Sequence, residues 1–270
     1  MTVTAWSVPW MSVSTSTEEG FVPPNPNGFY QPLFNVGPVE FTRPMLLITI
    51  VAAILITWLL VSTRKAAIVP SKGQYFTEQV YDFVRNGIAR DMIGHKDFMR
   101  FVPLLFSLFI YILLNNWFGS IPPFQNPPMA RIALPLGLVG IVYIGYHWVG
   151  IRKHGLGGYF KTMMPPGLPV YLAPVIFLLE LMTFFAVRPL TLTLRLFGNM
   201  FAGHMLMGVF ILGGSYLLLS GTPGLMAASI GAFGIGFLMQ LLELLIQAVQ
   251  AYVFTMLAAS YFGGAVADEH

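Results

Sequence analysis

Long apolar runs that contain almost no charge constrain the fold of this chain most strongly. Charged residues make up 9% of its 270 residues, whereas ordinary globular domains carry about 25%. So few charges could not cover the surface of a soluble fold, so lipid must solvate most of the chain. The absence of cysteine excludes disulfides, thiolate metal sites and a thiol nucleophile. A net charge of +3 does not indicate nucleic-acid binding, because the basic residues form no stripe.

The apolar runs predict five membrane crossings and an all-α membrane fold. The last two runs exceed the length of about 20 residues that one crossing needs, which predicts tilt or extension beyond the bilayer. Because proline removes a backbone donor, we expect the fourth run to bend at Pro174 or Pro189. The runs lie at about 45–61, 101–118, 132–149, 171–219 and 225–262, with a break at 220–224 between the last two.

The charged stretch 72–100 should not cross the membrane, and it predicts an amphipathic surface helix. Its apolar side chains recur at helical spacing and form one face. The helix could pack on soluble protein, but the lipid-embedded runs on either side favour a position on the membrane surface. The residues of this face are Phe76, Val80, Phe83, Val84 and Ile88.

Basic residues predict the orientation of the chain. Ten of them lie in segments 62–100 and 150–169, and two lie in the alternate segments, which places the former in the cytoplasm. The first 44 residues lack the basic and apolar regions of a signal peptide and contain many prolines, so we expect an irregular external tail. The predicted parts are an external tail (1–44), a first transmembrane helix (45–62), a cytoplasmic loop with the surface helix (63–100), a transmembrane hairpin (101–150), a cytoplasmic loop (151–169), a long helical hairpin (170–263) and a cytoplasmic C-terminal tail (264–270).

Arg195 is the residue least expected in its surroundings, because it lies inside the fourth apolar run. An arginine near the bilayer centre costs about 2.5 kcal/mol or more. Thr191 and Asn199 share its helix face, and small residues flank that face and would let another helix approach. The alternative is a guanidinium buried against a carboxylate of the same chain. Arg188, in the same run, could be accommodated by a kink or a water pocket at Pro189.

A second set of polar residues lies in the last two runs. Gln240, Glu243, Gln247 and Gln250 form one stripe on the final helix, which must face another helix or water because lipid cannot satisfy it. His204 lies nine residues after Arg195, half a turn out of phase and about 13 Å along the axis. His204 and Glu243 could relay a proton through water. The alternative for His204 is a hydrogen-bonded core histidine.

The run RPLTLTLRLFGNMFAGH at 188–204 resembles the signature of subunit a of F-type ATP synthases. The segments QAYVF at 250–254 and ADEH at 267–270 resemble the end of the same subunit, and the order of the parts is similar over nearly the whole chain. The surface-helix segment at 83–94 is similar to bacterial members, actinobacterial ones among them.

The resemblance implies a role for each candidate residue. Arg195 would face a ring of c subunits whose carboxylates carry protons, with Asn199 and Gln250 beside it. His204 and Glu243 stand where some members have glutamate and histidine, so the pair is exchanged. Gly119 stands where some members have aspartate, which puts the share of the second run in the channel in question. Further residues implied are Asn115, Asn116 and Gln247 for the outer half-channel and Glu180 for the inner one.

The predicted function is that of a proton-translocating stator subunit in a bacterial plasma membrane. The chain lacks a G-x-x-x-x-G-K-[ST] nucleotide loop, so we expect no enzyme activity of its own. We also expect no cofactor and no metal site. The expected partners are the c-ring, peripheral-stalk b-type subunits, the remaining synthase and lipid, without nucleic acid. Competing hypotheses fit less well, since a secondary transporter would show repeats and a haem subunit would need paired axial histidines.

Overall fold

The computed structural model describes residues 21, 23–24, 32–36, 39–64, 67, 69–120, 127–162 and 172–267. Within these ranges five helical segments are long and apolar enough to cross a membrane, which confirms the predicted all-α membrane fold. Most of the predicted external tail, part of the loop at 151–169 and residues 268–270 lie outside the described ranges. The five segments are Arg43–Thr63, Val102–Ser120, Ala133–Phe160, Ala173–Leu219 and Pro223–Val266.

The chain divides into two compact units, which are described separately. The first comprises Met1–Ile54, Ile112–Arg131 and Phe197–Gln250, and the second comprises Leu55–Tyr111, Ile132–Leu196 and Ala251–His270. Four long helices contribute to both units, namely α1 (Arg43–Thr63), α4 (Val102–Ser120), α7 (Arg188–Leu219) and α8 (Pro223–Val266).

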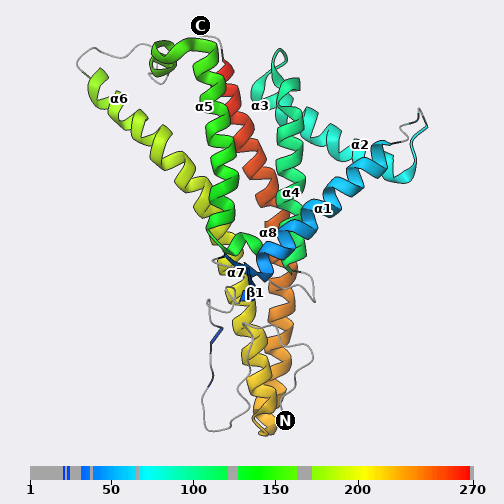
Figure 1. The fold of residues 1–270 in the computed structure, drawn as a ribbon. Helices are drawn as coiled ribbons and strands as arrows, with labels where there is room; N and C mark the ends of the chain where they lie inside the picture. Colours follow the sequence, from blue (N-terminus) through cyan, green and yellow to red (C-terminus); the bar gives the residue numbers. More distant parts are fainter. Residues whose placement is uncertain are drawn as a thin grey trace. The chain divides into compact units, whose positions relative to one another are not determined.

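In the first unit, the end of α7 and the start of α8 form a hairpin, and Figure 1 shows the two segments side by side in yellow and orange. The turn between them contains Gly221, whose positive φ of 71° is unfavourable for residues with a side chain. Gly214 lets the helices approach, because a Cβ at that position would lie 3.1 Å from the ring of Phe233. Met207, which is 1% exposed, is the centre of a small apolar core here.

A short hairpin precedes the first crossing, which the sequence did not predict. Strand β1 (Pro32–Val36) pairs antiparallel with β2 (Val39–Thr42), and α1 (Arg43–Thr63) follows directly. The guanidinium of Arg131 donates a hydrogen bond of 2.5 Å to the hydroxyl of Thr42. This bond ties the hairpin to the residue after the 3₁₀ turn Pro128–Ala130.

In the second unit, the predicted surface helix consists of α2 (Lys72–Val84), a π-helical segment η2 (Arg85–Arg90) and α3 (Asp91–Ile93). The apolar face is divided between two environments. Val84 and Ile88 are fully buried against protein, whereas Phe76 and Phe83 are 60% and 47% exposed. Large exposed aromatic side chains beside membrane spans fit contact with lipid, as expected for an interfacial helix.

Helix α5 (Ala133–Thr162) continues past residue 149, where the apolar run ends. Gly155 interrupts it with a φ of 70°, and the residues after this break turn back on the helix. The ring of Tyr159 then packs against Gly150 so closely that a Cβ at position 150 would clash with it. The tyrosine hydroxyl lies 2.7 Å from Nδ1 of His147. Two glycines therefore allow this tyrosine–histidine contact.

The fourth crossing is irregular where the sequence has a proline. Helix α6 (Ala173–Met182) leads into the π-helical segment η5 (Thr183–Val187), and α7 begins at Arg188. Pro189 cannot donate to the carbonyl four residues earlier and its ring crowds that carbonyl, which explains the wider turn before it. Pro174 lies in the first turn of α6, a position that tolerates proline.

Gly263→Ala should destabilise the second unit, because the added Cβ would lie 2.3 Å from the carbonyl oxygen of Met92. Overpacking of this kind costs about 1–3 kcal/mol. Gly264→Ala is the matched control, since a Cβ there meets nothing within 4 Å. Thermal unfolding of the purified membrane complex measures the effect, and equal midpoints for the two variants would contradict the packing observed at Gly263.

Candidate functional site

His204 and Glu243 form a buried pair in the first unit, one on α7 and one on α8. Nδ1 of His204 lies 2.5 Å from Oε1 of Glu243, and the side chains are 0% and 5% exposed. The contact is direct, whereas the sequence analysis expected water between the two groups. An acid and an imidazole within hydrogen-bond distance can exchange a proton without an intervening molecule.

The polar stripe of α8 faces other helices, as the cost of polar groups in lipid requires. Gln247 donates to Oγ of Ser120 at 2.5 Å and to Oε1 of Glu243 at 3.1 Å. Gln240 donates to the carbonyl of Ser120, and Asn116 donates to the carbonyl of Gln247, both at 3.4 Å. The end of α4 therefore binds Gln240 and Gln247, whereas Glu243 and Gln250 contact His204 and Asn199 of α7.

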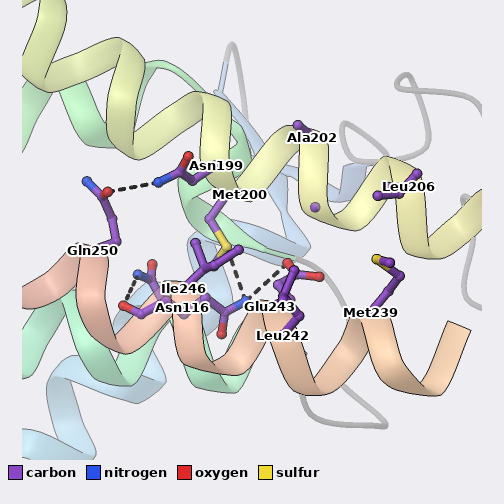
Figure 2. A pocket seen from close by; sticks show the side chains of 12 residues that line it. Asn116, Asn199, Met200, Ala202, Leu206, Met239, Leu242, Glu243, Ile246 and Gln250 are labelled. Carbon is purple, nitrogen blue, oxygen red and sulfur yellow. Dashed lines mark hydrogen bonds between the residues drawn. The ribbon is translucent and has the colours of Figure 1, made fainter. Parts of the chain in front are cut away.

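A cavity of about 230 Å³ lies beside the pair, and its lining includes Asn116, Asn199, Glu243, Gln247 and Gln250 (Figure 2). One buried polar atom of each of four residues has no hydrogen-bond partner within the described part of the chain. Because a buried polar group without a partner is costly, these atoms call for water, and one water needs only about 10–15 Å³. The atoms are Oδ1 of Asn116, Oε2 of Glu243, Oε1 of Gln247 and Nε2 of Gln250.

Gly203 permits the close approach of α7 and α8 at the pair. A Cβ at this position would lie 2.9 Å from both Cδ and Oε1 of Glu243. Sequence reasoning had drawn attention to His204 and passed over its neighbour. A glycine adjacent to a polar residue in a membrane helix is a usable signal for close helix packing.

Arg195 lies on α7 in the second unit and is exposed, as is Thr191. Within the described ranges no carboxylate forms an ion pair with Arg195, so the alternative of burial against an acid of the same chain has no support. Asn199, on the same helix in the first unit, donates to Oε1 of Gln250 at 2.8 Å (Figure 2). This bond orients the two amides that the resemblance associated with Arg195.

Arg188 lines a second cavity, of about 320 Å³, in the second unit, and a water pocket was one of the two alternatives that the sequence left open for this residue. The guanidinium lies 3.5 Å from the ring centroid of Phe184 and 5.3 Å from that of Tyr261. Tyr146, Tyr159 and Ser260 add hydroxyl groups to the lining. A π-helical segment and a cavity large enough for several waters thus occur together at Arg188.

The remaining candidates lie apart from these cavities. Glu180 is half-buried on α6 and lines neither one. Asn115 is fully buried on α4, and Gly119 contributes its backbone carbonyl, which lies 3.2 Å from Nε2 of His204. The described part of the chain holds no group of three or more histidine, cysteine or acidic residues that could bind a metal ion.

The fold and the buried acid–imidazole pair define a multi-pass membrane protein equipped to move protons. Comparison with known proteins agrees, because the ATP synthase A chain family model matches residues 45–263. The chain belongs to this family. It is therefore a non-catalytic, proton-translocating membrane subunit that associates with the rest of an ATP synthase complex.

Individual relatives cover nearly the whole chain. It is similar to ATP synthase subunit a of a Nocardioides species, with 43% identity over 96% of this chain and 98% of the relative. The subunit a of Pseudarthrobacter chlorophenolicus is 40% identical, over 93% and 95% of the two chains. That of a Parafrankia species is 38% identical, over 97% and 90%. The expected similarity to actinobacterial members is confirmed.

Gly203→Ala should separate His204 from Glu243, because the added methyl group would displace the carboxylate. A displacement near 1 Å can cost about a hundredfold in a positioned reaction, so ATP-driven acidification of inverted vesicles should fall by roughly ten- to a hundredfold. Gly231→Ala, where a Cβ meets nothing within 4 Å, should pump normally. Unchanged acidification by Gly203→Ala would show that the close approach is irrelevant to transport.

Proposed function

We propose that this subunit forms two separate aqueous half-channels, with Arg195 between them at the interface with a ring of c subunits. The observation that carries the proposal is the contrast between an exposed arginine without an ion-pair partner in the described chain and a buried pair beside a cavity. Lipid would penalise an exposed guanidinium at this depth, so a partner carrying acidic groups must cover it. A rotating ring of carboxylates meets that requirement.

The outer half-channel comprises His204, Glu243, Asn116 and Gln247. The four unpartnered polar atoms around the cavity support this assignment, because waters held by them would extend the path from the pair. Gln247 donates to Glu243 and so orients the carboxylate toward His204. Protons arriving through these waters then neutralise a carboxylate of the ring, which can afterwards face lipid at tolerable cost.

The inner half-channel begins at Glu180 and includes the cavity around Arg188. A proton-bearing ring site that completes its revolution loses its proton here. The tyrosine and serine hydroxyls beside Arg188 support a hydrated compartment, and Glu180 is half-buried on the preceding helix α6. The basic residues of the intervening loops orient this side toward the cytoplasm, with the N-terminus outside and the C-terminus inside.

Arg195 has two effects in this scheme. Its charge stabilises the anionic form of a ring carboxylate and so favours release of the proton. It also prevents protons from passing directly between the half-channels, because a guanidinium does not lose its own proton in proteins. Each proton that crosses the membrane contributes about 2.3 kcal/mol per 100 mV, and rotation transmits this energy to a distant nucleotide site. Peripheral-stalk b-type subunits would hold the subunit against that torque.

Arg195→Ala should abolish proton-driven ATP synthesis while the complex still assembles. Loss of the cation raises the pKa of the ring carboxylate by about one to three units and opens a direct path for protons between the half-channels, so synthesis should fall to the background rate. Arg152→Ala removes an exposed charge from α5, three residues before its break at Gly155, and serves as the control. Synthesis at a near-normal rate by the Arg195 variant, in membranes with normal subunit content, would contradict the proposal.

His204→Gln and Glu243→Gln should each reduce ATP-driven proton pumping by roughly a hundredfold, the lower range for loss of a general acid–base group. Each glutamine can keep hydrogen bonds of the original side chain but cannot carry a proton. Ser229→Ala is the control, since this buried serine of α8 bonds only the carbonyl of Met226 among the contacts described. Normal pumping by both glutamine variants would remove the pair from the path.

A further inference from the structure

Both ring nitrogens of His204 face hydrogen-bond acceptors. Nε2 lies 3.2 Å from the carbonyl oxygen of Gly119, and Nδ1 lies 2.5 Å from Oε1 of Glu243 and 3.1 Å from the carbonyl oxygen of Met200. A carbonyl oxygen can only accept, so Nε2 must carry a proton to make its bond. The tautomer with an unprotonated Nε2 would instead direct a lone pair at the carbonyl.

The carbonyl of Gly119 is free to accept and is held in place. It lies in the last turn of α4, where helix carbonyls have no partner within the helix. A Cβ at this position would lie 2.8 Å from Cα of Pro127 and 3.3 Å from its Cβ, so the peptide is packed tightly against the following chain. Because Gly119 has no side chain, its peptide can pack against Pro127, and this packing holds the carbonyl oxygen beside the imidazole.

With Nε2 protonated, two arrangements of one further proton satisfy the contact between Nδ1 and Oε1. In the first, a protonated Glu243 donates to a neutral imidazole, whose Nδ1 then makes no bond to the carbonyl of Met200. In the second, an imidazolium donates from Nδ1 to the Glu243 carboxylate, with the Met200 carbonyl as a second acceptor. The two contain the same number of protons and differ only in the position of one, so transfer between them breaks one bond to hydrogen and forms another. Removal of that proton would leave two lone pairs facing each other.

We propose that the Gly119 carbonyl is a positioning group that holds a proton on Nε2 of His204 and so confines the mobile proton to the contact between Nδ1 and Glu243. This inference rests on the proposed function of the pair. Among the described residues that line the adjoining cavity, Glu243 is the only titratable one, and its Oε2 has no partner there. Oε2 is therefore the atom at which protons from cavity water enter and leave.

The proposal makes positions 204 and 243 non-equivalent. Position 204 needs a donor toward Gly119, and position 243 needs an acid with one oxygen toward the imidazole and one toward the cavity. A carboxylate at position 204 would place an anion against the Gly119 carbonyl. Gln247 donates to Oε1 from within α8, and Ser120 of α4 accepts from Gln247, so these neighbours of the pair are uncharged.

Nitrogen-15 NMR of the assembled complex with labelled histidine tests the protonation pattern directly. Subtraction of the spectrum of His204→Gln isolates the two signals of His204. We expect Nε2 to show the signal of an N–H, and Nδ1 to show the signal of a nitrogen that shares a proton with a carboxylate. An N–H on Nδ1 with an unprotonated Nε2, or an Nδ1 that shares no proton with Glu243, would overturn the proposal.

Two sets of variants test the positioning role in inverted vesicles. Gly119→Ala must displace the peptide, so ATP-driven pumping should fall at least about tenfold and the N–H signal of Nε2 should be lost. Gly234→Ala is the control and should match the wild type, because a Cβ there meets nothing within 4 Å.

The exchanged variant His204→Glu with Glu243→His should assemble but pump at a similarly low rate. Wild-type pumping by the exchanged variant or by Gly119→Ala would contradict the inference. Wild-type pumping by His204→Gln and Glu243→Gln would instead contradict the proposed function.

Discussion

The cost of a polar group in hydrocarbon is the constraint on which the structure depends. Each polar side chain of the long helices must find a partner in the protein, contact water or be covered by another subunit. His204 and Glu243 satisfy each other, and Gln247 binds the end of α4. Arg195 is exposed, and within the described chain no carboxylate forms an ion pair with it. The same penalty thus explains both the buried pair and the requirement for a partner at the arginine.

Glycines determine where the helices can satisfy this constraint. Gly203 lets Glu243 reach His204, and Gly119 brings a backbone carbonyl to the other side of the imidazole. Gly150 and Gly155 act similarly in the second unit, where Tyr159 turns back to His147. A Cβ at Gly203, Gly119 or Gly150 would clash with the observed packing, and the positive φ of Gly155 disfavours any side chain there. Close packing at small residues is the main way in which membrane helices associate, and here it also positions the groups that carry protons.

Much of this organisation could be predicted from the sequence, because hydropathy and helical periodicity are local properties. The five crossings, the surface helix and the direction of the polar stripe of α8 were predictable on that basis. The β1–β2 hairpin and the return of α5 at Gly155 depend on tertiary packing and were not. The partner of Nε2 is a backbone atom, so no motif could reveal it. The cavity at Arg188 is lined by residues from distant segments, and only the fold brings them together.

The exposure of the Arg195 face to a ring of carboxylates is the central claim, and disulfide cross-linking tests it most directly. The chain contains no cysteine, so single cysteines can be introduced without interference. Thr191 is exposed on the face of Arg195, whereas Thr193 is 2% exposed and its hydroxyl bonds the carbonyl of Pro189. With a cysteine placed beside the ring carboxylate, Thr191→Cys should cross-link to the ring subunit and Thr193→Cys should not. Cross-linking of Thr193→Cys alone, or equal cross-linking of both, would contradict the account.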